Sequence, residues 1–294
     1  MRDYDMWTDS AVRKVTQSLI DARWKFDQDD AEKELPGSGK SVPRPRQAGL
    51  VVSFWKSRQT GAGKPGHDYL HWSGLVTSVI QLGIAAIPCC VWGDWSVLLV
   101  TTGAMLLCFS MGSLYQWRVE KWACRRLNSR NKKIFILTRG NGAQHAIAIL
   151  NDGCGLDLED LATGFENLDA PSITLAAQLA TVVLGILWVV LLITSLAITQ
   201  SGWFLIAVGG IGTIQNMFVA GWQRKPEALG VPLDFIDVVG DVKVMNTLLE
   251  VERRYEKLGK SMLKTFFAGD PSEDEKRQWD AIAEEWIEKH RSRG

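Results

Sequence analysis

Two long stretches of this chain contain no basic residue. All 33 Lys and Arg residues fall in three blocks, residues 1–72, 117–172 and 223–294. The stretches between these blocks are apolar, and Asp94 is the only acidic residue in either of them. About 20 helical residues cross a bilayer core that is about 30 Å thick. Each stretch is therefore long enough to cross a bilayer and return, which predicts an integral membrane protein.

The two stretches divide into four candidate transmembrane helices. These are residues 72–91, 96–116, 173–199 and 202–222. The connections, 92–95 and 200–201, are so short that they can join only antiparallel neighbours. We therefore predict an α-helical integral membrane protein with two transmembrane hairpins, 72–116 and 173–222. The bilayer is its expected partner.

Tryptophan and basic residues predict the ends and the orientation of these helices. Indole rings favour the membrane interface, and six of them lie at expected helix ends: Trp72, Trp92, Trp95, Trp117, Trp203 and Trp222. Basic residues close to a span favour the cytosolic side. They follow the second and fourth spans: Arg118, Lys121, Arg125, Arg126, Arg130, Lys132, Lys133, Arg224 and Lys225. Both termini and the middle segment are thus expected on the cytosolic side. The pattern does not indicate which cellular membrane this is.

No expected span carries Asp, Glu, Lys, Arg or His, although pumps and proton-coupled carriers usually need such a group at depth. Four amide groups are the candidate polar intramembrane groups: Gln81, Gln178, Gln215 and Asn216. We expect them to form hydrogen bonds between helices rather than an ion path. The fourth span also contains Gly209, Gly210 and Gly212, which suits either a close packing face or a re-entrant segment.

Small residues recur at four-residue spacing in two of the spans. The second span has Ala104, Cys108 and Gly112, and the third has Ala177, Thr181 and Gly185. Such small-residue faces allow helices to approach closely. A compact bundle and a homo-oligomer both remain open. Balanced charge, 33 basic and 33 acidic residues, gives no reason to expect a nucleic-acid partner.

The remaining segments predict a small cytosolic α+β domain. Residues 1–33 contain an amphipathic helix with Val12, Val15, Leu19 and Ala22 on one face and Asp9 or Ser10 as its N-cap. Residues 34–71, rich in Pro, Gly, Ser and basic residues, indicate a flexible linker. Residues 117–172 form a cytosolic insertion containing a β-hairpin over 133–150, in which Asn141-Gly142 supplies the turn.

Residues 223–294 indicate a helical C-terminal segment. Val244, Leu248, Val251, Tyr255 and Leu258 keep helical spacing, and Gly259 is placed to end that helix. Ser272 and Glu275 then match a capping box that begins another helix.

No catalytic, cofactor-binding or metal-binding motif is expected. His145, Cys154 and Asp157 lie close together in sequence, but no spacing rule fixes their geometry for nucleophilic catalysis. The chain has no phosphate-binding loop and no metal-ligand spacing. We therefore expect no cofactor, no metal and no catalytic residue.

Several stretches resemble a group of uncharacterised multi-spanning membrane proteins of filamentous fungi. They are residues 137–142, 144–147, 155–162, 229–235 and 243–267, within a similar region of about residues 70–285. The resemblance implies membrane residence and carries no activity, cofactor or site residue to this chain.

Three classes of function remain open on these grounds. The leading hypothesis is a non-enzymatic membrane anchor or scaffold that assembles with itself or with partners. The alternative is a channel or carrier subunit for a small neutral or hydrophobic solute, lined by the four amide groups. The third is a lipid-acting membrane enzyme, for which His67 and His71 are the only histidines near a span end.

Overall fold

The computed structural model describes residues 9–34, 42–115, 117, 124–127, 132–153, 155–163, 175–267 and 269–292. The chain folds as two compact units. The sheet unit comprises residues 1–60, 127–155 and 232–294, and the helix unit comprises residues 61–126 and 156–231. The chain therefore passes from one unit to the other four times.

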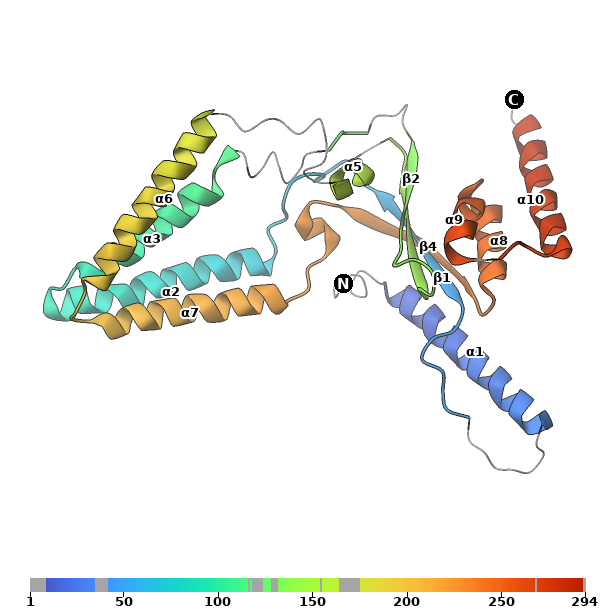
Figure 1. Ribbon diagram of the computed structural model, residues 1–294, viewed down its shortest axis with the longest axis horizontal. Helices are drawn as coiled ribbons and strands as arrows, with labels where there is room; N and C mark the ends of the chain where they lie inside the picture. The colour runs from blue at the N-terminus through green and yellow to red at the C-terminus, as the bar shows by residue number, and fades with distance from the viewer. Residues whose placement is uncertain are drawn as a thin grey trace. The chain divides into compact units, whose positions relative to one another are not determined.

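A four-stranded mixed sheet organises the sheet unit (Figure 1). Its strands are β1 (Leu50–Ser57), β2 (Lys133–Leu137), β3 (His145–Asn151) and β4 (Leu233–Asp241). They lie in the order β2-β3-β1-β4. The central pair, β1 and β3, is parallel, and each outer strand is antiparallel to its neighbour. The hairpin expected over 133–150 is confirmed, with Phe135 opposite Ile149.

All four connections to the helix unit leave from the same end of the strands. The last residues of β1 and β3 lie at this end together with the first residues of β2 and β4, because the outer strands run opposite to the central pair. Two backbone hydrogen bonds join neighbouring connections here. Arg58 N–H donates to Pro232 O at 3.1 Å, and Leu127 N–H donates to Gly155 O at 3.1 Å.

Helices cover both faces of the sheet. Helices α8 (Val244–Arg254), α9 (Leu258–Phe266) and α10 (Glu273–Arg291) build the larger core on one face, and α1 (Ser10–Glu34) packs on the other. The larger core includes Leu50, Val52, Phe54, Ala146, Ala148, Leu248, Val251, Met262 and Ile282. The smaller one includes Val12, Leu19, Ala48 and Val51.

Capping residues fix where the terminal helices begin. The Asp9 carboxylate accepts the Ala11 N–H at 2.9 Å at the start of α1. The expected α1 face is buried at Val12 and Leu19, whereas Ala22 is exposed. Ser272 and Glu275 form the expected capping box of α10, which satisfies two backbone N–H groups that would otherwise lack partners.

Four apolar helices build the helix unit (Figure 1). They are α2 (Tyr69–Trp92), α3 (Ser96–Gly112), α6 (Leu175–Leu196) and α7 (Gly202–Gly221). Helix α2 packs against α7, and α3 packs against α6. A short helix, α5 (Leu158–Thr163), precedes α6, and a 3₁₀ turn, η2 (Pro226–Leu229), follows α7. The chain is thus mostly helical with one small sheet.

Three of these helices, α2, α6 and α7, are long and apolar enough to cross a membrane. Helix α3 is equally apolar but has 17 residues. The four helices match the expected spans to within a few residues. Gln116 and residues 173–174, which the expected spans include, lie outside the described part of the chain.

Four expectations about the segments outside the apolar helices need correction. The stretch 34–71 is not a flexible linker throughout, because β1 forms within it, and the segment 223–294 contains the strand β4 as well as helices. Gly259 does not end a helix but lies inside α9. In the turn between β2 and β3, Gly140 and Gly142 take positive φ angles, while Asn141 does not.

Candidate functional site

Two of the four candidate amide groups form hydrogen bonds between helices, and the other two are exposed. Gln81 of α2 donates from Nε2 to the backbone O of Val208 in α7 at 2.9 Å. Gln215 of α7 donates from Nε2 to Ser73 Oγ of α2 at 2.8 Å. Gln178 and Asn216 are exposed on α6 and α7. The structure therefore brings Gln81 and Gln215 into the contact between α2 and α7 and does not gather the four amides around one cavity.

A glycine makes room for one of these contacts. A Cβ atom on Gly212 would lie 2.8 Å from Gln81 Nε2, so a larger residue there would displace the Gln81 side chain. Hydrogen bonds between membrane helices are worth about 0.6 to 2 kcal/mol. Together with the apolar cluster of Ala85 and Val208, to which Val97 of α3 also belongs, they hold α2 and α7 side by side.

An ion pair joins the N-terminal end of α2 to the C-terminal end of α7. Arg224 donates from Nε to Asp68 Oδ2 at 2.8 Å and from Nη2 to Asp68 Oδ1 at 3.0 Å. Asp68 is also the N-cap of α2, accepting the His71 N–H at 3.1 Å. Partial burial acts to raise the pKa of the Asp68 carboxyl, but these hydrogen bonds and the guanidinium charge hold the pKa below its ordinary value.

Aromatic residues adjoin this ion pair in sequence at the ends of α2 and α7. Tyr69 and Trp222 are in edge contact with ring centroids 5.6 Å apart, and Phe218 lies 5.1 Å from Trp222. Aromatic side chains with one polar end favour the boundary between lipid and water. The arrangement suits the end of a helix pair at a membrane surface.

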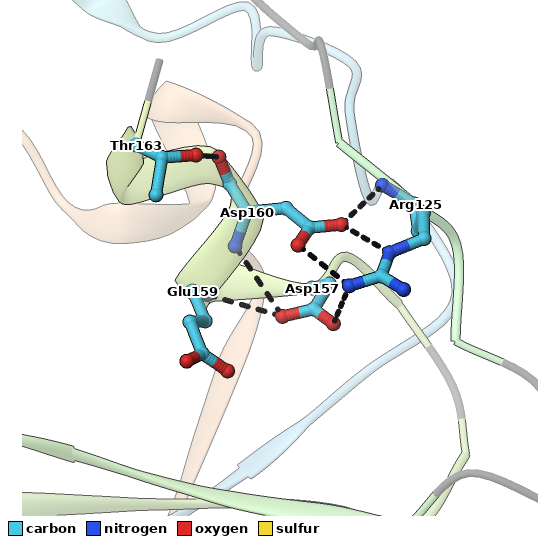
Figure 2. Close-up of polar contacts among 5 residues, drawn as sticks. All are labelled: Arg125, Asp157, Glu159, Asp160 and Thr163. Atoms are coloured by element: carbon cyan, nitrogen blue, oxygen red, sulfur yellow. Dashed lines mark hydrogen bonds and ion pairs between the residues drawn. The ribbon is translucent and has the colours of Figure 1, made fainter. Parts of the chain in front are cut away.

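A second ion pair lies beside α5 (Figure 2). Arg125 donates from Nε to Asp160 Oδ2 at 2.6 Å and from Nη2 to Asp160 Oδ1 at 2.8 Å. Asp157, which is 1% exposed, lies 3.9 Å from the Arg125 Nη2. Its carboxylate also accepts the Glu159 N–H at 3.1 Å, so it satisfies the first turn of α5 as well as facing the guanidinium. The cluster ties the segment after α3 to the segment before α6.

The neighbouring thiol is not set up as a nucleophile. Burial and the nearby carboxylates of Asp160 and Asp157 raise the pKa of the Cys124 thiol above its ordinary value. A thiolate, not a thiol, is the reactive form. At neutral pH this side chain therefore stays protonated.

The residues considered for nucleophilic catalysis have other roles where the structure describes them. His145 Nε2 is hydrogen-bonded to Ser53 Oγ at 2.8 Å, and the Trp55 indole donates to the same oxygen at 3.0 Å. Ser53 is fully buried, so no substrate can reach its hydroxyl. Asp157 belongs to the helix unit, and Cys154 lies outside the described residues.

His67 and His71, considered for a lipid-acting enzyme, are in edge-to-face contact at the start of α2, with ring centroids 4.7 Å apart. Both rings are exposed. Across the described ranges, His, Cys, Asp and Glu side chains nowhere gather in threes that could hold a metal ion.

Sequence reasoning missed both ion pairs. Asp68 and Arg224 are separated by 156 positions, and Arg125 and Asp160 by 35. One signal was available for the first pair, because Asp68 directly precedes an apolar run and Arg224 closely follows another. Comparison of the chain with protein-family models, curated proteins and solved structures finds no match.

Proposed function

We propose that the protein is a four-span membrane scaffold that holds its sheet unit at the cytosolic surface of a membrane and assembles with itself. The observation that carries this proposal is that all four connections to the apolar helices leave the sheet at the same end of its strands. Each helical pair is inserted between two strands, α2 and α3 between β1 and β2, and α6 and α7 between β3 and β4.

The sheet supports an even number of membrane crossings in each helical segment inserted between two strands. Strands of an open sheet must share one aqueous compartment, because unpaired sheet edges are not tolerated in lipid. A chain that leaves β1, crosses through α2 and then pairs again as β2 must therefore cross back. Helix α3 is the segment available for the return.

The length of α3 is compatible with this role. Its 17 residues span about 26 Å at about 1.5 Å per residue, a few ångströms less than a typical hydrocarbon core of about 30 Å. Local bilayer thinning accommodates such a mismatch at a modest cost in free energy. Tyr115 and Trp117, both exposed, follow at the expected interface.

No observation favours the carrier or enzyme alternatives in the same way. Gln81 and Gln215 are used in the contact between α2 and α7, and the other two amides point away from the bundle. The scaffold proposal needs only the features that are present: apolar helices, a folded sheet and paired connections.

Acceptor loops for N-glycosylation test the topology. A long flexible loop with an acceptor site, inserted next to Asp94, should be glycosylated in microsomes, because we place that connection on the far side of the membrane. The same loop inserted at Asn141 in the exposed β2–β3 turn should remain unmodified. Glycosylation at Asn141, or its absence at Asp94 in a membrane-inserted protein, would contradict the four-span arrangement.

Two differently tagged copies test self-assembly. The α6 stripe of Thr181 and Gly185 is exposed, and a Cβ on Gly185 would meet no atom within 4 Å. We expect Gly185→Leu to reduce co-purification of the two copies from mild detergent about fivefold, because it blocks a close approach of helices. Val183→Leu, on another exposed side of α6, is the matched control. Equal co-purification in both variants would exclude this face as the contact.

A further inference from the structure

The order of strands in the sheet is symmetric. Exchanging β1 with β3 and β2 with β4 turns the order β2-β3-β1-β4 into β4-β1-β3-β2, which is the same order taken from the other edge. The exchange also leaves the relative strand directions unchanged, because the central pair is parallel and both outer pairs are antiparallel. The sheet is thus organised as two equivalent pairs of strands.

Two of the helix contacts in the helix unit follow the same exchange, whereas the close contact between α2 and α3 has no equally close counterpart between α6 and α7. Replacing α2 by α6 and α7 by α3 turns the α2–α7 pair into the α6–α3 pair, and both pairs are in contact. Among the elements that the structure describes, β1-α2-α3-β2 is followed by β3-α6-α7-β4, with α5 before α6 and η2 after α7. Each half is therefore a strand–helix–helix–strand repeat.

The connections within the helix unit also come in two matching pairs. In the first stem (residues 61–68 with 224–231), Gly63 N–H donates to Gly230 O at 2.9 Å and Gly66 N–H donates to Ala228 O at 3.2 Å. In the second stem (residues 124–126 with 156–160), Asp157 N–H donates to Arg125 O at 2.9 Å. In both stems a segment leading toward a helix lies against a segment returning from one.

Each stem contains one bidentate Arg–Asp pair with the same polarity. Asp68 is the N-cap of α2 and Asp160 lies in α5, ahead of α6, while the arginine, Arg224 or Arg125, follows the outgoing helix. Figure 2 shows the second of these pairs. Two parallel hydrogen bonds give such a pair a fixed geometry, which a lysine could not reproduce.

We propose that the chain is built from two equivalent strand–helix–helix–strand repeats, and that Arg224 and Arg125 are equivalent positioning residues, each holding its own helix pair together at its stem. Parallel repeats of this kind are a known way to build membrane proteins. The effect should be larger in the first stem. There the side chains of Arg224 and Asp68 are 29% and 18% exposed, whereas in the second stem Asp160 is 14% exposed but Arg125 is 63% exposed, and solvent weakens ion pairs.

Disulfide formation between introduced cysteines reports on each helix pair separately. In the full chain with its five native cysteines replaced, Ser73→Cys with Gln215→Cys reports on α2–α7, because these side chains touch at 2.8 Å. Gly103→Cys with Leu191→Cys reports on α3–α6, because a Cβ on Gly103 would lie 3.1 Å from the Leu191 side chain. Cross-linking rates are measured in native membranes.

We expect Arg224→Asp to slow the α2–α7 cross-link about fivefold and to leave the α3–α6 cross-link unchanged. Arg125→Asp should slow only the α3–α6 cross-link, and by less. The exchanged pairs, Asp68→Arg with Arg224→Asp and Asp160→Arg with Arg125→Asp, should restore the rates. Equal slowing of both cross-links, no slowing, or failure of the exchanged pairs to restore them would each overturn the proposal. These rates do not depend on the side of the membrane, so they are independent of the glycosylation test.

Discussion

Replacing Gly259 by alanine should abolish the folded sheet unit. Gly259 lies in α9 where it crosses α8, and a Cβ atom there would be 2.1 Å from the Leu248 O and 3.0 Å from the Glu252 N. Both neighbours are backbone atoms in the larger core, so no side-chain rotation can relieve the overlap. Overpacking of this severity costs about 3 kcal/mol or more, a large part of the stability of a typical domain.

Hydrogen exchange measured by mass spectrometry on the purified protein in nanodiscs checks this prediction. Peptides from β1 and α8 should lose protection in Gly259→Ala. The matched control is Gly269→Ala, where the nearest atom would be a Phe267 ring carbon at 3.8 Å, an ordinary contact. Native protection in both variants would show that α8 and α9 do not approach as closely as described.

Replacing Glu252 by alanine should destabilise the sheet unit by about 2 to 4 kcal/mol. The Glu252 carboxylate is 7% exposed and accepts the Lys257 N–H at 2.7 Å and the Lys260 N–H at 2.9 Å. It thereby satisfies the first turn of α9 and holds Lys257 in its left-handed conformation, φ 64°. Alanine would leave these backbone donors without the acceptor that the fold provides.

Thermal unfolding of the detergent-solubilised protein measures this loss. Glu252→Gln, which keeps one uncharged acceptor oxygen, should fall between the native protein and Glu252→Ala. Glu250→Ala is the control, because Glu250 lies two positions away in α8, has a side chain that is 39% exposed, and pairs with Arg253 and Arg254. Such surface pairs contribute at most about 1 kcal/mol. Equal midpoints for the two alanine variants would rule out the capping role of Glu252.

The apolar helices and one hairpin were predictable because their signals are local. Lys133–Leu137 and His145–Asn151 are strand-forming segments flanking a Gly-rich turn, and antiparallel neighbours of this kind pair through short-range contacts. The capping box at Ser272 and Glu275 was equally visible, because both partners lie within one turn of the helix.

The other two strands carry no such signal. Leu50 to Phe54 of β1 are all buried, since helices cover both faces of the sheet there, and a doubly buried strand does not alternate between apolar and polar residues. Strand β4 carries Asp234 and Asp237 and is an edge strand with an irregularity opposite Phe54 and Trp55. Charges and bulges are common at such edges, and they obscured the strand pattern.

Gly259 shows a different limit of sequence reasoning. A glycine after a helical pattern usually ends the helix, but here the missing side chain serves a close approach of two backbones. The Arg–Asp pairs are beyond local reasoning for a similar reason, because only the tertiary fold decides which of many charged residues meet. Asp68 and Arg224 become neighbours only once α2 and α7 lie side by side.

The split of the sheet into three sequence segments has a consequence for biosynthesis. A ribosome delivers β1 first, then α2 and α3, then β2 and β3, then α6 and α7, and only afterwards β4 with the helices that complete the larger core. With the apolar helices in a membrane, as we propose, most of the nascent chain reaches the insertion machinery before the sheet unit can finish folding. A chain that stops before residue 233 would carry all its apolar helices but lack β4 and α8 to α10, leaving β1 with an unpaired edge that cellular quality control can recognise.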